Sequence, residues 1–162
     1  MTTAIYPGTF DPFTNGHCDL VRRASTLFDK IYIAVARSSS KNPLFSLEAR
    51  IDLVEQVLAD EDIEVEVLGF QSLMVDCAKE LGVSAIIRGL RAVSDFEYEV
   101  QLASMNRKLC PEIETVYLSP SEEHAAVSSS LLKDIAWHGG DVSRFTHPVV
   151  NQALMKAAKG AS

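Results

Sequence analysis

The residues that could do chemistry follow short apolar runs at four places in the chain. "PGTFDPFTNGH" at 7–17 supplies His17, and "RSSSKNP" at 37–43 supplies Lys41. "IIRGLRAVSDFEYE" at 86–99 places Arg88 and Arg91 around a glycine, and "VSSS" at 127–130 brings three serines. All of these groups can bind phosphate oxygens. Since no nucleophile with an oriented base is visible, they predict a polyphosphate site that acts by stabilising charge.

His17 has two interpretations. Thr14 or Asn15 can cap a following helix, which puts His17 in its first turn. A helix N-terminus carries partial positive charge and unpaired N–H groups, so a histidine there can add a donor to a phosphate oxygen. The same position suits a histidine that only caps or packs, and position alone does not separate the two.

The other groups also have structural alternatives. Lys41 in its polar loop could be a solvated surface lysine. Arg88 and Arg91 could form ion pairs with Asp95, Glu97 or Glu99 instead of binding phosphate. The serines could simply cap a helix, but capping needs one serine, so three in a row favour a ligand.

These residues are carried by alternating strand and helix patterns. Short apolar runs predict buried strands near 3–6, 30–36, 63–70, 84–89 and 114–119. Helical patterns cover 15–28, 46–60, 72–82, 94–109, 128–138 and 147–159, with Ser46 and Ser94 as expected caps. The alternation predicts an α/β fold: a Rossmann-like, doubly wound, parallel five-stranded sheet with helices on both faces, in one domain over 1–162. Ligands of such sheets bind beyond the carboxyl ends of the strands.

Composition excludes several classes of protein. The chain of 162 residues has a net charge of −7, which argues on electrostatic grounds against a protein that wraps nucleic acid. Three dispersed cysteines argue against a disulfide framework or zinc site and for a reducing compartment. We see no signal peptide and no apolar run near the ~20 residues of a membrane span. A cytoplasmic protein without a membrane partner is expected.

The motifs together resemble the bacterial phosphopantetheine adenylyltransferases. "TNGH" matches the [T/H]xGH signature of the nucleotidylyltransferase superfamily, and "RGLRAVSDFEYE", "QLASMNR", "KNPLFSLEAR" and "VSSS" narrow the match. The resemblance implies that the phosphate of 4'-phosphopantetheine attacks the α-phosphorus of ATP, giving dephospho-CoA and pyrophosphate. It also implies Mg2+, held mainly through the ATP phosphates, possible feedback by CoA, and a homohexamer.

The resemblance also assigns residues. His17 would stabilise charge on the α-phosphate, with Lys41 and Arg91 as further catalytic groups. The residues implied to contact ATP are Thr9, Phe10, His17, Gly89, Arg91, Glu99, His124, Val127, Ser128, Ser129 and Ser130. The residues implied to contact phosphopantetheine are Thr9, Lys41, Met74, Arg88 and Asn106.

One stretch departs from the family pattern, and two alternative functions remain. His124, Ala125 and Ala126 stand where relatives commonly carry an aromatic residue, then Ser and Phe, so the packing around adenine and ribose is in question. A transferase of the same superfamily could use nicotinate mononucleotide or a cytidylyl substrate, although the "RGLR" and "DFEYE" stretches argue against it. A non-catalytic nucleotide sensor would not require His17, Lys41, Arg88 and Arg91 together.

Overall fold

The computed structural model describes residues 1–37 and 42–160, so Lys41 lies outside the described residues. Five parallel strands form one sheet in the order β3-β2-β1-β4-β5. The strands are β1 (Thr3–Gly8), β2 (Lys30–Ala36), β3 (Glu66–Phe70), β4 (Ala85–Gly89) and β5 (Glu114–Leu118). The predicted doubly wound sheet is therefore confirmed, and its order reverses between β1 and β4.

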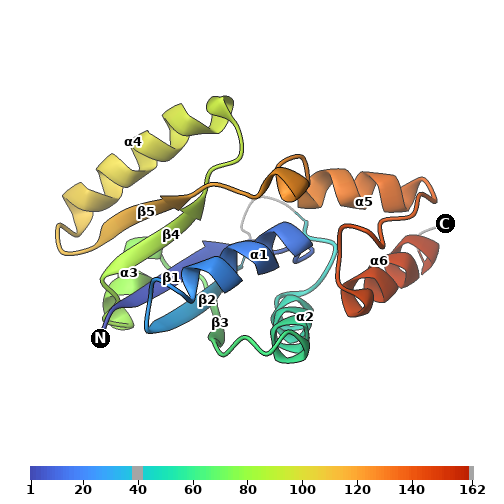
Figure 1. Cartoon of the computed structure of the whole chain (residues 1–162), viewed down its shortest axis with the longest axis horizontal. Coiled ribbons are helices and arrows are strands. Elements are labelled where there is room, and N and C mark those ends of the chain that lie inside the picture. Colours follow the sequence, from blue (N-terminus) through green and yellow to red (C-terminus); the bar gives the residue numbers. More distant parts are fainter. Residues whose placement is uncertain (38–41, 161–162) are drawn as a thin grey trace.

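Six α-helices and one 3₁₀ turn connect and follow the strands in the described chain. They are α1 (Asn15–Ala24), α2 (Leu47–Asp60), α3 (Met74–Glu80), α4 (Val93–Leu109), η1 (Glu122–His124), α5 (Ser129–Trp137) and α6 (Pro148–Gly160). Figure 1 shows α5 and α6 side by side at one end of the molecule. None of the helices in the described ranges is long and apolar enough to cross a membrane.

The two faces of the sheet carry different helices because side chains alternate along each strand. On one face, Ile33 and Ile87 join a core made with α1, α2, α5 and α6. On the other face, Ile5 and Ile86 join a smaller core made mainly with α3. The strands β1, β2 and β4 bury side chains on both faces, as the sequence predicts, whereas the edge strands β3 and β5 have no fully buried residue.

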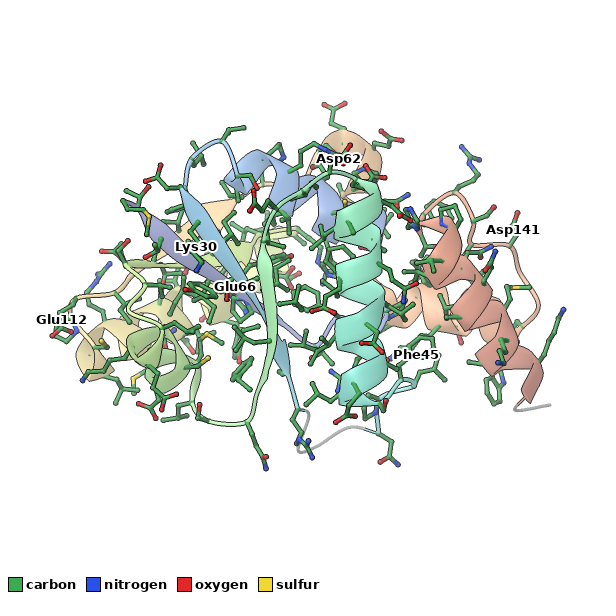
Figure 2. All side chains as sticks on the ribbon, turned by 90° about the horizontal axis from the view of Figure 1, so that it is seen from below. Lys30, Phe45, Asp62, Glu66, Glu112 and Asp141 are labelled. Carbon is green, nitrogen blue, oxygen red and sulfur yellow. The ribbon has the colours of Figure 1, made fainter. Side chains whose placement is uncertain are left out.

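The strand β3 lies at one edge of the sheet and begins with a charged residue, Glu66. Figure 2 shows Lys30 of β2 and Glu66 of β3 beside one another, and they form an ion pair. The same view shows α2 running from Phe45, just before it, to Asp62, just after it. Charged side chains on edge strands discourage pairing with another chain.

Several element boundaries differ from the sequence prediction. The first helix ends at Ala24 rather than near residue 28, because the hydroxyls of Ser25 and Thr26 bond to carbonyls of the last turn. Leu27 is consequently exposed and not part of the apolar face. Ser94 lies inside α4, whose N-cap is Ala92 without a side-chain bond. The third strand begins at Glu66, not at residue 63.

The helix α4 buries few of its residues. Figure 1 shows it running alongside β5 at the edge of the molecule. Only Glu99 and Asn106 are buried among its residues, whereas Phe96, Tyr98 and Met105 are exposed. A helix of the core would bury an apolar stripe, so α4 keeps an apolar surface that this single chain does not cover.

Candidate functional site

A cavity of about 510 Å³ opens at the carboxyl ends of β1 and β4, where the strand order reverses. Ligands of open α/β sheets bind at this position. The lining combines the loop after β1, the first turn of α1, the loop before α2, the exit of β4 and the N-terminus of α5. The predicted residues in it are Thr9, Phe10, His17, Arg88, Gly89, Arg91, Glu99, His124, Val127, Ser128, Ser129 and Ser130.

His17 is held by a reciprocal cap at the start of α1. The backbone N–H of Thr14 donates to Nδ1 of His17 at 3.0 Å, and the hydroxyl of Thr14 accepts from the backbone N–H of His17 at 3.3 Å. Since Nδ1 accepts, the neutral ring carries its proton on Nε2. The two interpretations of His17 are thus compatible: one nitrogen caps the helix, and the other remains a donor on a ring that lines the cavity.

The surroundings of His17 favour the neutral imidazole. Its ring stacks on Phe13 at 5.5 Å and meets the edge of Phe10 at 5.1 Å between centroids. Burial, together with the positive charge of Arg91, lowers the pKa of His17 to about 4. The protein therefore presents an uncharged donor at neutral pH, with positive charge supplied by neighbouring arginines.

Phe10 reaches this position through an unusual backbone conformation. Its φ is +49°, which non-glycine residues rarely adopt, and its ring folds back over Gly8. A Cβ at Gly8 would lie 2.8 Å from Cζ of Phe10, too close for any other residue. The "PGTF" stretch therefore serves to pack an aromatic ring beside His17.

Arg88 and Glu99 form a bidentate ion pair at the cavity wall. Nε and Nη2 of Arg88 donate to the two carboxylate oxygens of Glu99 at 2.9 and 2.7 Å. The ion-pair alternative is therefore realised for Arg88, with Glu99 as its partner. Its side chain is still 28% exposed, whereas that of Glu99 is only 9% exposed. The pair keeps a guanidinium fixed at the mouth of the cavity.

Arg91 is exposed and less constrained. Its Nη1 donates to the carbonyl of Val127 at 3.3 Å, which links the exit of β4 to the segment before α5. Arg88 and Arg91 both act electrostatically on the buried hydroxyl of Tyr6, whose pKa is nevertheless raised by burial. Both arginines line the same cavity.

The three serines have different roles at the start of α5. The hydroxyl of Ser128 caps the helix by accepting from the N–H of Leu131, and that of Ser129 donates to the carbonyl of Pro12. The hydroxyl of Ser130 has no hydrogen-bond partner among the described residues, and Ser130 lines the cavity. The first amides of a helix also have no intrahelical partner, so this end is suited to an anion.

His124 faces the start of α1. A Cβ on Gly16 would lie 3.4 Å from Cβ of His124, so the loop that departs from the family pattern packs directly against the helix turn that carries His17. Ala125 and Ala126, beside it, are exposed and add no ring to this wall.

Two predicted substrate residues lie away from the cavity. Met74 begins α3 and packs against the smaller core on the other face of the sheet, and Asn106 is buried on α4. Neither lines the cavity, so their predicted roles remain predictions. Lys41 lies outside the described residues, although Asn42 and Pro43, which follow it, line the cavity.

Sequence reasoning missed two charged residues of this site. Asp11 is 3% exposed, and its carboxylate accepts from Nζ of Lys133 at 2.9 Å; both residues line the cavity. The available signal for Lys133 was its position one turn after Ser129 on the same helix. No local signal pairs it with Asp11, which is 122 residues away.

The site offers little to a metal ion from protein groups alone. Within residues 1–37 and 42–160, no group of three or more His, Cys, Asp or Glu residues could hold one. The carboxylates of Asp11 and Glu99 are already bonded to Lys133 and Arg88. A divalent cation in this cavity would need most of its oxygen ligands from a bound phosphate.

Comparison with known proteins agrees with this architecture. Residues 5–135 match the family model described as Cytidylyltransferase-like, which runs from within β1 to within α5 and includes every predicted site residue.

Three solved structures illustrate the similarity of fold. A putative nicotinate-nucleotide adenylyltransferase from Vibrio parahaemolyticus is 16% identical, with a TM-score of 0.71 over 100% of this chain and 98% of that one. A bifunctional NMN adenylyltransferase/ADP ribose pyrophosphatase from Francisella tularensis is 14% identical, with a TM-score of 0.75 over 98% of this chain and 51% of that one. A lipopolysaccharide core biosynthesis protein from Thermoplasma volcanium GSS1 is 24% identical, with a TM-score of 0.59 over 75% and 99%.

We predict that His17 makes stability depend on pH. Its pKa of about 4 in the folded chain lies below the ordinary value of 6.5, so the unfolded chain binds the proton first. The stabilisation is complete above pH 6.5 and is lost as pH falls towards 4, by on the order of 2 kcal/mol. His17→Gln keeps an acceptor for the Thr14 amide but cannot titrate. Chemical denaturation at pH 7 and pH 4.5 should show a smaller loss for the variant; equal losses would contradict the assignment.

Proposed function

Since this chain belongs to the Cytidylyltransferase-like family, we propose that it is a nucleotidyltransferase that moves the adenylyl group of ATP to 4'-phosphopantetheine. The products would be dephospho-CoA and pyrophosphate. Family membership supports nucleotidyl transfer as the class of reaction, and the sequence resemblance to phosphopantetheine adenylyltransferases supports the choice of acceptor.

One observation carries the reaction type: a neutral histidine whose Nδ1 is fixed by a backbone amide, placed beside two arginines and a helix N-terminus in one cavity. Such an arrangement binds anions at several points without providing a nucleophile or a strong base. In the proposed reaction, an oxygen of the acceptor phosphate attacks the α-phosphorus of ATP, and the bond to the β-phosphate breaks. The attacking group is already an anion, so alignment and charge neutralisation are sufficient.

Each wall of the cavity has a proposed task. The Nε2 proton of His17 would bond to the α-phosphate as charge develops there. Arg91 and the start of α5 would hold the departing phosphates, and Arg88 and Thr9 would hold the acceptor phosphate. Lys41 is proposed to assist Thr9, and Mg2+ to arrive with the ATP phosphates, where it would shield the leaving pyrophosphate.

The assembly and regulation of the enzyme are part of the same proposal. The exposed apolar residues of α4, including Phe96 and Met105, support association between copies of this chain, and the resemblance favours a homohexamer. The resemblance also assigns Met74 and Asn106 to the pantetheine arm. CoA, which contains the same arm, would be a feedback ligand.

The acceptor is tested by a direct comparison. We expect pyrophosphate release from ATP with 4'-phosphopantetheine, reversal by added pyrophosphate, and loss of turnover in EDTA. Nicotinate mononucleotide and NMN should give at least 100-fold lower kcat/KM. They are the informative rivals because similar folds occur in proteins described as adenylyltransferases for these nucleotides. Preference for either one would replace the proposed acceptor, and binding of ATP without any turnover would favour a sensor.

His17 should be essential for the rate rather than for binding. Removing a preorganised donor to transition-state charge typically costs about 10²–10³ in rate. We expect His17→Ala to lose that much kcat, while calorimetric titration shows little change in ATP affinity. If His17→Ala keeps the wild-type kcat per ATP-binding site, His17 acts only as a helix cap.

The two arginines should affect different substrates. Arg88→Lys keeps a charge beside Glu99 but loses the planar fork, so the KM for the acceptor should rise about tenfold. Arg91→Ala should instead raise the KM for ATP about tenfold. Arg22→Ala is the matched control, because Arg22 lies on α1 and its exposed side chain forms an ion pair with Glu61. Equal effects on both KM values would show that the two sub-sites are wrongly assigned.

A further inference from the structure

A buried carboxylate joins three segments that form the walls of the cavity. Asp11, in the loop after β1, accepts from the backbone N–H of Leu44 at 2.8 Å and from that of Phe45 at 3.0 Å. The same carboxylate accepts from Nζ of Lys133 on α5 at 2.9 Å. Its side chain is only 3% exposed. Asp11 therefore ties the loop before α2 and the anion-binding helix α5 to the end of β1.

A buried arginine holds the carbonyl side of the same segments. Arg50 of α2 is 1% exposed. Its Nε donates to the carbonyls of Phe45 and Ser46, and its Nη1 donates to those of Thr9 at 2.7 Å and Ala36 at 2.8 Å. Phe45, labelled in Figure 2 beside the start of α2, is thus held on both sides: its N–H by Asp11 and its carbonyl by Arg50.

Asp11 belongs to the cavity wall with only 3% of its side chain exposed, whereas Arg50 is buried behind that wall. Asn42 and Pro43 line the cavity immediately before the amides that Asp11 binds. Thr9, whose carbonyl Arg50 binds, lines it on the acceptor side, whereas Lys133 and Ser130 line it on the side of α5. Any change in the distances between these segments would therefore move the two sides of the cavity relative to one another.

Hydrophobic packing alone would be a poorer way to fix this geometry. Burying a carboxylate and a guanidinium costs free energy that their bonds only partly return, so charged groups do not improve stability over apolar ones at such positions. Directional bonds to backbone amides and carbonyls, however, define a loop position that apolar contacts leave loose. In-line transfer is sensitive to this, because a displacement of about 1 Å can cost ~100-fold in rate.

We propose that Asp11 and Arg50 are positioning residues that lock the loop before α2 against β1 and α5, and so keep the acceptor and nucleotide sides of the cavity in register. They act through Thr9, the 42–45 segment and α5, without touching the reactants. The effect on turnover rests on the proposed function, whereas the effect on the loop does not.

The test begins with the loop itself. Asp11→Asn keeps the size of the side chain but removes its charge and turns one acceptor into a donor. Amide hydrogen exchange of Leu44 and Phe45 should become at least tenfold faster, while amides in the middle of α2 keep their protection. Asp19→Asn, which removes a carboxylate paired with Arg23 on the outside of α1, is the matched control and should leave these amides unchanged.

Turnover then separates positioning from stability. Per site that binds ATP, Asp11→Asn should lower kcat 10- to 100-fold, with less than threefold change in ATP affinity. Arg50→Lys, which retains the charge but cannot bind carbonyls from all three segments, should act in the same direction on both exchange and kcat. If these residues only stabilised the fold, their substitution would lower the fraction of active sites and leave kcat per active site unchanged.

The outcomes are distinguishable from failure of the proposed function. Unchanged exchange at Leu44 and Phe45 in Asp11→Asn would overturn the proposal, whatever the activity. Faster exchange with kcat per site within threefold of wild type would also overturn it. If the wild-type protein turned over none of the acceptors, the proposed function would fall, and exchange, which uses no substrate, would decide the role of the two residues.

Discussion

The hydrogen bond from the backbone amide of Thr14 to Nδ1 of His17 is the interaction on which the site depends. It satisfies a donor that the start of α1 would otherwise leave unpaired, so it helps to fix where the helix begins. The same bond selects the tautomer with a proton on Nε2 and limits rotation of the ring. Helix start, ring orientation and donor capacity therefore follow from one contact between residues three positions apart.

The position of that helix start is set by the sheet. Because the order reverses between β1 and β4, the loops leaving these strands diverge to opposite faces and leave a space at the carboxyl edge. His17 enters this space from α1, Arg88 and Arg91 from the end of β4, and the serines from α5. Helix N-termini and guanidinium groups thus converge from segments more than 100 residues apart. Among the described residues, the cavity lining holds three basic side chains, Arg88, Arg91 and Lys133. Arg88 and Lys133 are paired with Glu99 and Asp11, and the lining also includes Asp95.

The charges of the site are arranged in pairs that leave some groups available. Both carboxylate oxygens of Glu99 accept hydrogen bonds from Arg88, and the carboxylate of Asp11 accepts one from Lys133. Arg91 and Ser130, by contrast, are exposed. Pairing lowers the cost of holding cations at a partly buried wall before a ligand arrives. It also keeps the side chains ordered, so less freedom is lost on binding.

The sequence by itself determined what depends on neighbours along the chain. Alternating apolar runs predicted five buried strands and their covering helices, and Thr14, Ser46 and Ser128 were readable as caps because each bonds within its own first turn. Placement after strands predicted that His17, Arg88, Arg91 and the three serines lie at one edge of the sheet, and all of them line one cavity. The family resemblance supplied the other six predicted residues of that cavity. The boundaries that were wrong, at Leu27 and Ser94, depend on competition between side-chain and backbone bonds that propensity does not resolve.

Only the tertiary structure decided which groups are partners. Whether Arg88 faces solvent, a ligand or Glu99 depends on how α4 lies over β4 and β5, and the bonds of Asp11 to Leu44, Phe45 and Lys133 join residues 33 to 122 positions apart. The low pKa of His17 likewise results from aromatic rings and an arginine packed around it. Such contacts leave no periodic trace in a sequence, because long-range pairing is selected by the packing of the whole sheet and its helices rather than by local conformation.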